Sequence, residues 1–162
     1  MSDMRCDVSL TVNGEQVRET IDARQTLVDF LREQLVLTGS HVGCEHGVCG
    51  ACTVRVNGLI VRGCLMLAAQ CEGAKVETIE GLSDTGEIAD LQAAFEKRNA
   101  LQCGFCTPGM LLTAQELLAA GGVPSREKIR EHISGNYCRC TGYHAIVDAI
   151  EAVAQQRAGG GK

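Results

Sequence analysis

The sequence predicts an α+β chain, in which a small mixed β-sheet curled over one helix is followed by a bundle of four helices. Three observations lead to this prediction. Two short strand-like runs surround each of two Asn-Gly pairs in the first half of the chain. A glycine-rich stretch at residues 39–52 has neither the strand nor the helix period. After Gly81 the apolar residues recur at helical spacing.

The first half is expected to form two hairpins, one helix and a long loop. Asn-Gly between two alternating runs is a strong hairpin signal, because both residues tolerate positive φ angles. Thr26 is a plausible N-cap for the helix, since Leu27, Phe30 and Leu31 follow it at helical spacing. Residues 39–52 are expected to form the loop. The expected strands are residues 6–12, 16–21, 53–56, 59–61 and 75–79, and the helix covers residues 26–37.

The second half is expected to be helical. Pro108 suits the first turn of a helix, and Ser125 is a plausible N-cap for the next one. Short connections between helices favour a bundle. The expected helices cover residues 87–98, 109–120, 124–132 and 141–156, with a linker at 80–86. We therefore expect domains at residues 1–80 and 81–158, followed by a disordered tail at 159–162.

Composition and charge exclude several classes of function. The net charge is −5, from 15 Lys and Arg against 20 Asp and Glu, which argues against nucleic-acid binding. No apolar run approaches the roughly 20 residues that span a bilayer. The N-terminus shows no secretory signal, so we expect a cytoplasmic protein in which thiols stay reduced. The ten cysteines are therefore interpreted as metal ligands before disulfides.

The first cysteine group consists of Cys44, Cys49, Cys52 and Cys64. The order C-x4-C-x2-C followed by a distant fourth cysteine is the plant-type [2Fe–2S] pattern. A loop that wraps a cluster needs close backbone approach and positive φ angles, which the glycines at positions 43, 47 and 50 allow. Backbone amides of such a loop can donate hydrogen bonds to the cluster sulfurs.

Two other centres are less compatible with this spacing. Structural zinc usually takes its four thiolates as two close pairs, whereas this group is a triple plus one. A Rieske centre replaces two cysteines by histidines, but no C-x-x-H occurs in the chain. His46 is interpreted as a solvated loop side chain.

The second cysteine group consists of Cys103, Cys106, Cys138 and Cys140. Its spacing is C-x2-C and then C-x-C, and each pair falls where a loop meets an expected helix. A helix N-terminus favours thiolates and the anionic cluster that they hold. The spacing alone also fits zinc. A thioredoxin-like redox site is excluded because it needs a βαβ context.

Three segments resemble the iron–sulfur subunit of the molybdenum hydroxylase (xanthine oxidase) family. They are GCEHGVCGACTV at residues 43–54, LQCGFCTPGM at 101–110 and GNYCRCTGY at 135–143. Their order matches the family, and the resemblance extends from about residue 6 to residue 153. It implies a plant-ferredoxin-like β-grasp domain followed by a four-helix bundle domain. It also implies that both cysteine groups hold [2Fe–2S] clusters.

The resemblance further implies a role as the non-catalytic, electron-transfer subunit of an oxidoreductase. Gln102 and Cys140 match the family positions that contact molybdopterin, which a separate large subunit holds. The second group would then lie nearest the molybdenum, and the first would face FAD on a medium subunit. The large, the medium and this small subunit would together make a heterotrimer, and we expect a dimer of heterotrimers. No residue is expected to act in catalysis on the substrate.

The other reactive or aromatic residues are interpreted as packing. Cys6 and Cys71 lie in apolar surroundings, where cysteine commonly behaves as a small apolar residue. Phe105, Met110 and Tyr143 adjoin the second cysteine group and are also interpreted as packing. Two alternatives stay open: a free-standing two-cluster ferredoxin and a structural zinc protein without redox function.

Overall fold

Both Asn-Gly pairs form the tight turns that the sequence predicts. The φ angles are 50° and 87° at Asn13 and Gly14, and 50° and 85° at Asn57 and Gly58. Positive φ at both central residues matches the twist of the flanking strands. The first turn joins β1 (Arg5–Val12) to β2 (Glu15–Asp22), and the second joins β3 (Thr53–Val56) to β4 (Leu59–Arg62), each pair antiparallel.

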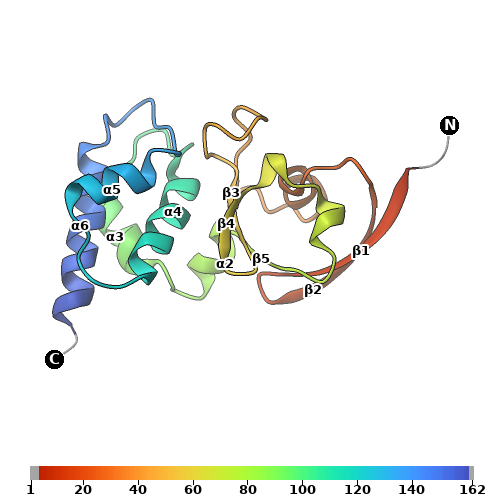
Figure 1. Ribbon diagram of the computed structural model, residues 1–162, viewed down its shortest axis with the longest axis horizontal. Coiled ribbons are helices and arrows are strands. Elements are labelled where there is room, and N and C mark those ends of the chain that lie inside the picture. The colour runs from red at the N-terminus through yellow and green to blue at the C-terminus, as the bar shows by residue number, and fades with distance from the viewer. Residues whose placement is uncertain (1–3, 161–162) are drawn as a thin grey trace.

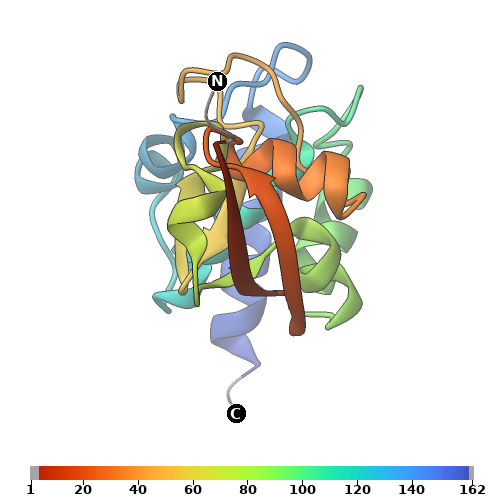
Figure 2. The same ribbon diagram turned by 90° about the vertical axis from the view of Figure 1, so that its right-hand side faces the viewer.

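The two hairpins belong to one mixed sheet in the computed structural model, which describes residues 4–160. The central strand is β5 (Lys75–Glu77), which runs parallel to β1 and antiparallel to β3. The strand order is β2-β1-β5-β3-β4. Figure 1 shows this sheet at one end of an elongated molecule and the helical half at the other, and Figure 2 views the molecule from the end with the β1–β2 hairpin. The mixed sheet of the sequence prediction is therefore confirmed.

The helix of the first half begins at the expected cap and ends earlier than expected. The Thr26 hydroxyl accepts a hydrogen bond from the amide of Asp29 at 3.2 Å. The helical segment comprises α1 (Leu27–Asp29) and the π-helical turn η1 (Phe30–Gln34). It buries Leu27 and Phe30 against the sheet in a core that also contains Val54 and Val76. Two short 3₁₀ turns follow β4, namely η2 (Gly63–Leu65) and η3 (Ala68–Cys71).

The second half contains four longer helices at the expected places. The Ser125 hydroxyl accepts a hydrogen bond from the amide of Lys128 at 3.2 Å, so the expected cap of the third helix is confirmed. Pro108 lies in the first turn of its helix, as predicted. The helices are α3 (Ala89–Lys97), α4 (Thr107–Ala119), α5 (Arg126–Ile133) and α6 (His144–Gly159).

The structure forms helix over most of the predicted linker and at the first residue of the predicted tail. A short helix, α2 (Ile79–Asp84), occupies most of residues 80–86. Ile79 and Leu82 are one helical turn apart and are buried in the helical core, which explains why the segment is ordered. Helix α6 begins three residues later than predicted and continues through Gly159. Residues 161–162 of the predicted tail lie outside the described residues.

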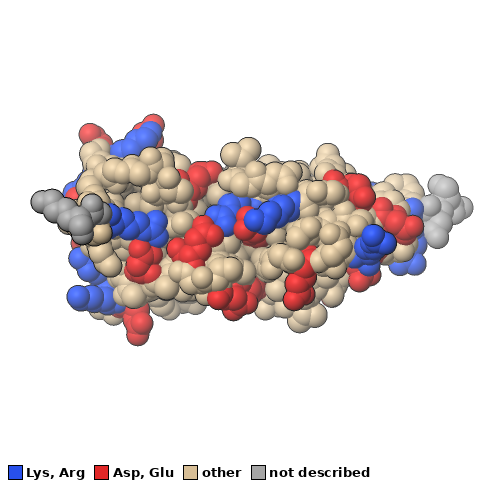
Figure 3. All heavy atoms as spheres, turned by 90° about the horizontal axis from the view of Figure 1, so that it is seen from below, with Lys and Arg blue, Asp and Glu red and all other residues tan. Residues whose placement is uncertain are grey.

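Each half has its own hydrophobic core. The core of the first half draws on residues 8–76, and the core of the second half on residues 79–154. The face seen from below in Figure 3 carries acidic and basic side chains intermixed along the molecule. Among residues 4–160, no helix combines the length and the apolarity needed to cross a membrane.

Candidate metal centres

The cysteine-bearing loops lie along one edge of the molecule. The loop at residues 39–52, the segment before α4 and the loop before α6 all appear at the top of Figures 1 and 2. Chain segments that are about 90 residues apart in sequence therefore meet at one edge. Cys64 approaches from η2, which follows the second hairpin.

The thiols of the first group form two neighbouring pairs. The amide of Cys49 donates a hydrogen bond to Cys44 Sγ at 3.4 Å. The thiols of Cys64 and Cys49 both lie close enough to Cys52 to raise its pKa. The structure therefore brings together all four cysteines that the spacing predicted. Their role as ligands stays a prediction.

The loop environment affects the four thiols of this group unequally. Hydrogen bonds from the amides of Cys49 and His46 lower the pKa of Cys44 to about 6. Burial raises the pKa of Cys52 to about 11. A thiol must lose its proton to bind a metal, so amides directed at sulfur favour binding at Cys44, and bound iron has to offset burial at Cys52.

The glycines of this loop allow the close approach that the sequence analysis predicted. A Cβ atom on Gly43 would lie 3.1 Å from Cys49 Sγ. Gly50 has a φ of 75°, and a Cβ atom there would lie 2.5 Å from the carbonyl oxygen of Gly135. A side chain at either position would compete for space with the sulfur or with the second half of the molecule.

The second group also forms two neighbouring pairs. The Sγ atoms of Cys103 and Cys140 are 3.5 Å apart, and both residues are exposed. Burial and, to a smaller extent, the neighbouring thiol of Cys138 raise the pKa of Cys106 to about 12. Burial also raises the pKa of Cys138, but the Thr141 hydroxyl and nearby amides outweigh it, so the net pKa is lowered.

The two cysteine pairs that are adjacent in sequence, Cys103 with Cys106 and Cys138 with Cys140, differ in how they lie relative to the helices. Cys106 is the residue directly before α4, as the junction in the sequence predicted. The other pair does not adjoin a helix, because α6 begins only at His144. Cys138 and Cys140 instead lie in the loop at residues 134–143, where side chains and loop amides supply the hydrogen bonds.

Pairs of thiols match the needs of a two-iron cluster. Among the residues that the structure describes, no three His, Cys, Asp or Glu side chains are grouped to hold a single metal ion. In a [2Fe–2S] cluster with four cysteines, each iron takes two thiolates and the sulfides complete its coordination. Two adjacent pairs per group therefore fit such a cluster by the chemistry of the donor set.

A seam joins the two cysteine groups, and we define it as the buried residues Gly50, Gly109 and Asn136 together with the exposed residue Tyr137. Asn136 is 1% exposed, and its side-chain amide donates to the carbonyl oxygen of Gly50 at 3.2 Å. Its side-chain oxygen accepts from the Thr113 hydroxyl at 2.9 Å. A Cβ atom on Gly109 would lie 2.3 Å from the Gly50 carbonyl oxygen.

The seam also contains a direct backbone connection between the groups. The amide of Tyr137 donates to the carbonyl oxygen of Cys49 at 2.8 Å. Tyr137 directly precedes Cys138 in the chain, so one hydrogen bond links a cysteine of the first group to a neighbour of the second. Nearby, the ring of His41 stacks on that of Phe105, with centroids 4.6 Å apart.

Gln102 and Cys140, the two residues that the resemblance assigns to molybdopterin, contact each other in the structure. The Gln102 side chain is exposed and donates its amide hydrogen to the carbonyl oxygen of Cys140 at 3.0 Å. Their contact with a pterin stays a prediction. His46 is exposed, as predicted, although its ring also contacts the Cys44 carbonyl oxygen.

The packing interpretations are confirmed for some residues and incomplete for others. Met110 and Cys71 are fully buried, and Cys6 packs against the sheet core at partial burial. Phe105 is 45% exposed, and its ring stacks on that of His41. Tyr143 packs on the helical core, but its hydroxyl also accepts the amide hydrogen of Cys138 at 2.9 Å.

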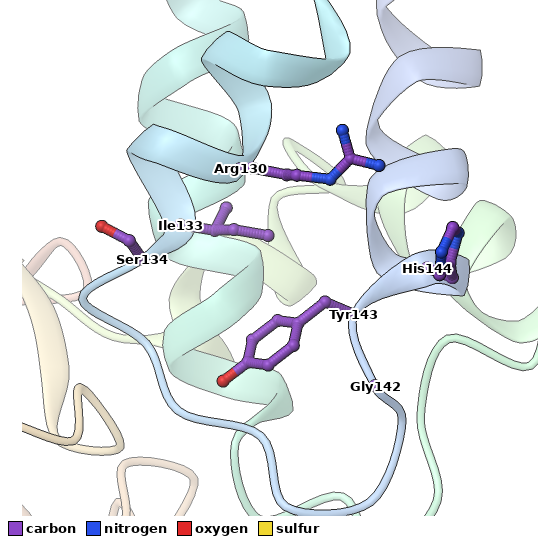
Figure 4. Close-up of a pocket in the computed structure, with 6 residues that line it drawn as sticks. All are labelled: Arg130, Ile133, Ser134, Gly142, Tyr143 and His144. Carbon is purple, nitrogen blue, oxygen red and sulfur yellow. The ribbon is translucent and has the colours of Figure 1, made fainter.

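Sequence reasoning missed Thr141, Tyr143 and Asn136 as polar residues of the site. A cavity of about 430 Å³ adjoins this loop, with Tyr143 between α5 and the start of α6 (Figure 4). The signal that could have identified Asn136, Thr141 and Tyr143 is their position in the segment GNYCRCTGY, which contains Cys138 and Cys140. The cavity is lined by Arg130, Ile133, Ser134, Gly142, Tyr143 and His144.

Comparison with known proteins defines the class of the chain first. A 2Fe-2S iron-sulfur cluster binding domain matches residues 10–82, and a [2Fe-2S] binding domain matches residues 78–151. Both halves of the chain are thus of iron–sulfur type.

Full-length relatives define the family. The gamma subunit of caffeine dehydrogenase from Pseudomonas sp. (strain CBB1) is 53% identical, over 91% of this chain and 90% of its own length. The small subunit of nicotine 6-hydroxylase from Paenarthrobacter nicotinovorans is 52% identical, over 90% of this chain and 88% of its own. A chain of quinoline 2-oxidoreductase from Pseudomonas putida 86 superimposes with a TM-score of 0.90 at 48% identity, covering 98% of both chains. This chain belongs to the iron–sulfur subunits of the molybdenum hydroxylase family.

Proposed function

We propose that this chain carries two [2Fe–2S] clusters and transfers single electrons between a molybdopterin subunit and an FAD subunit. The observation that carries this proposal is the arrangement of eight cysteines as two groups of neighbouring thiols, seven of them in loops at one edge of the molecule. When bound, the clusters supply two sites that each accept and release one electron. Cys44, Cys49, Cys52 and Cys64 would hold one cluster, and Cys103, Cys106, Cys138 and Cys140 the other.

The chain's own residues would keep the two centres at a fixed separation. Asn136 and the glycines of the seam pack the first loop closely against α4. The Tyr137 amide connects Cys49 to the second group by a hydrogen bond. We regard the first half as the β-grasp domain and α3–α6 as the four-helix bundle, with the boundary near residue 80. The separate cores of the two halves support this division.

Exposed residues support the expected orientation toward the partner subunits. Cys103, Cys140 and Gln102 are exposed, and the apolar side chains of Leu101 and Tyr137 nearby are 39% and 55% exposed. A large subunit covering this surface would bring its molybdopterin to Gln102 and Cys140. In the first group, Val48 and Leu65 are 43% and 64% exposed beside Cys49 and Cys64, where the FAD subunit would bind.

Metal analysis of the purified chain tests the clusters directly. We expect about four iron and four acid-labile sulfide per chain, with a visible spectrum that bleaches on reduction. A colourless protein loaded with zinc would contradict the proposal.

Purification from the native source tests the partners. We expect a complex with one molybdopterin-containing and one FAD-containing subunit, assembled as a dimer of heterotrimers. Isolation as a stable monomer that shuttles electrons between separate enzymes would favour the ferredoxin alternative instead.

A further inference from the structure

Three residues beside the second cysteine group form a closed hydrogen-bond network, which we call the Cys138 network. The Thr141 hydroxyl donates to Cys138 Sγ at 3.0 Å. The backbone amide of Tyr143 donates to Thr141 Oγ at 3.2 Å. The phenol oxygen of Tyr143 accepts the amide hydrogen of Cys138 at 2.9 Å. Each of the three residues is thereby connected to the other two.

An unusual backbone conformation builds this network. Gly142 and Tyr143 have φ angles of 64° and 67°, both in the left-handed region. A non-glycine residue rarely adopts this region, and its cost has to be offset by other interactions. At Tyr143 the conformation turns the amide toward Thr141 and the ring back toward the loop that precedes α6 (Figure 4).

The network determines the direction of the Thr141 hydroxyl. A hydroxyl has one proton to donate and can accept through its lone pairs. Because the Tyr143 amide already donates to this oxygen, the proton is directed at Cys138 Sγ. In the first group, within residues 4–160, the sulfur Cys44 Sγ accepts its hydrogen bond from a backbone amide, and no side-chain hydroxyl donates to that group.

We propose that Thr141 and Tyr143 are positioning residues that make the second cluster easier to reduce than its thiolates alone would. This inference rests on the proposed function, because Cys138 Sγ here stands for a thiolate ligand. Reduction adds one electron to the cluster, and no bond forms or breaks and the Thr141 proton stays on its oxygen. A donor directed at sulfur stabilises the more negative, reduced state and raises the reduction potential.

Redox titration of the full chain, followed by electron paramagnetic resonance, tests the proposal. Unsubstituted protein with about four iron per chain gives one midpoint potential for each cluster. We expect Thr141→Val to lower only one of the two. The expected shift is about tenfold in that reduction equilibrium, equivalent to about 59 mV for a one-electron couple.

Three further variants make the result specific. Thr141→Ser retains the hydroxyl and is expected to restore most of the potential. Tyr143→Phe retains the ring but removes the acceptor for the Cys138 amide, and it is expected to move the same potential and not the other. Thr107→Val is the matched control, because Thr107 adjoins Cys106 and, within the described residues, makes no hydrogen bond to a cysteine sulfur.

The outcomes separate this inference from the proposed function. Unchanged potentials in Thr141→Val, equal shifts of both potentials, or a shift of the same size in Thr107→Val would overturn the role of Thr141 while leaving the clusters in place. A lack of iron in the unsubstituted protein would overturn both proposals. Should Thr141→Val not assemble its second cluster, Tyr143→Phe decides the question, because an unchanged potential in that variant would overturn the proposal.

Discussion

The first cysteine group takes three of its four thiols from one loop, whereas the second is assembled from two segments with α4 and α5 between them. In the first group Cys52 is buried and the other three cysteines are half-buried. In the second group Cys106 is buried and Cys138 is half-buried, whereas Cys103 and Cys140 are exposed. A group built within one loop is thus encoded by local spacing, while the second exists only if the helical half folds.

Substitution of one cysteine ligand should show most clearly whether the two cysteine groups bind iron independently. We expect Cys106→Ser to reduce the iron content from about four to about two per chain, because the first group does not use this residue. Cys52→Ser should remove the other two irons. Iron and sulfide analysis measures both, and Cys6→Ser is the control that should retain all four. Complete loss of iron from either ligand variant would show that the groups are not independent.

A substitution in the seam tests whether the two groups depend on each other through packing. A Cβ atom on Gly109 would lie 2.3 Å from the backbone oxygen of Gly50, so Gly109→Ala has to displace backbone. We expect a loss of about 3 kcal/mol in the free energy of unfolding, at the upper end for overpacking. Denaturant unfolding measures it. Gly159→Ala is the matched control in α6, where nothing lies within 4 Å, and it should not destabilise the chain.

Acid should weaken an ion-pair network that also joins the two halves. Arg55 of β3 binds Glu77 of β5 at 2.9 Å and Glu87 at 2.7 Å, and Glu87 also accepts from Gln115 of α4 at 3.1 Å. Hydrogen bonds from Arg55 lower the pKa of both carboxyls in the folded chain. Their contribution is therefore present above the ordinary Glu pKa of about 4.3 and is lost as the pH falls through the lowered values.

Glu87→Gln should isolate this contribution. The side chain of Glu87 is 34% exposed, so solvent screening limits the expected loss at pH 7 to about 1 kcal/mol. Thermal unfolding from pH 7 downward should show the difference from the unsubstituted chain shrinking below about pH 4. Glu131→Gln, which removes an exposed pair with Lys128, is the control with no expected change. A constant difference at all pH values would argue against the network.

The smallest effect is expected within the first half alone. Val36 has a φ of 57° and is 73% exposed, so a β-branched side chain occupies a strained conformation without being buried. Val36→Gly should stabilise the chain by about 0.5 kcal/mol, because relief of strain exceeds the entropy that glycine adds to the unfolded state. Denaturant unfolding measures the gain. Val123→Gly, at an exposed position whose φ is not positive, should give no gain.

Sequence reasoning succeeded where the signal was local. The Asn-Gly turns, the Thr26 and Ser125 caps and the glycines of the first loop all act on neighbouring residues. It missed α2, because two apolar residues one turn apart are too weak a pattern unless the packing partner is known. It also treated Tyr143 as packing alone, because the sequence does not indicate which backbone amide a phenol hydroxyl will contact in the folded chain.

The sequence by itself determined the number and spacing of the thiols and, through its three motifs, the family of the chain, and it predicts the type of the first centre. Tertiary structure decided how Cys103 meets Cys140 and Cys106 meets Cys138, and how the seam holds the two groups together. The physical reason is distance along the chain. The nine residues from Cys44 to Cys52 place three sulfurs close together through local spacing. Cys106 and Cys138 are more than thirty positions apart, so they come together only when the helices between them have packed.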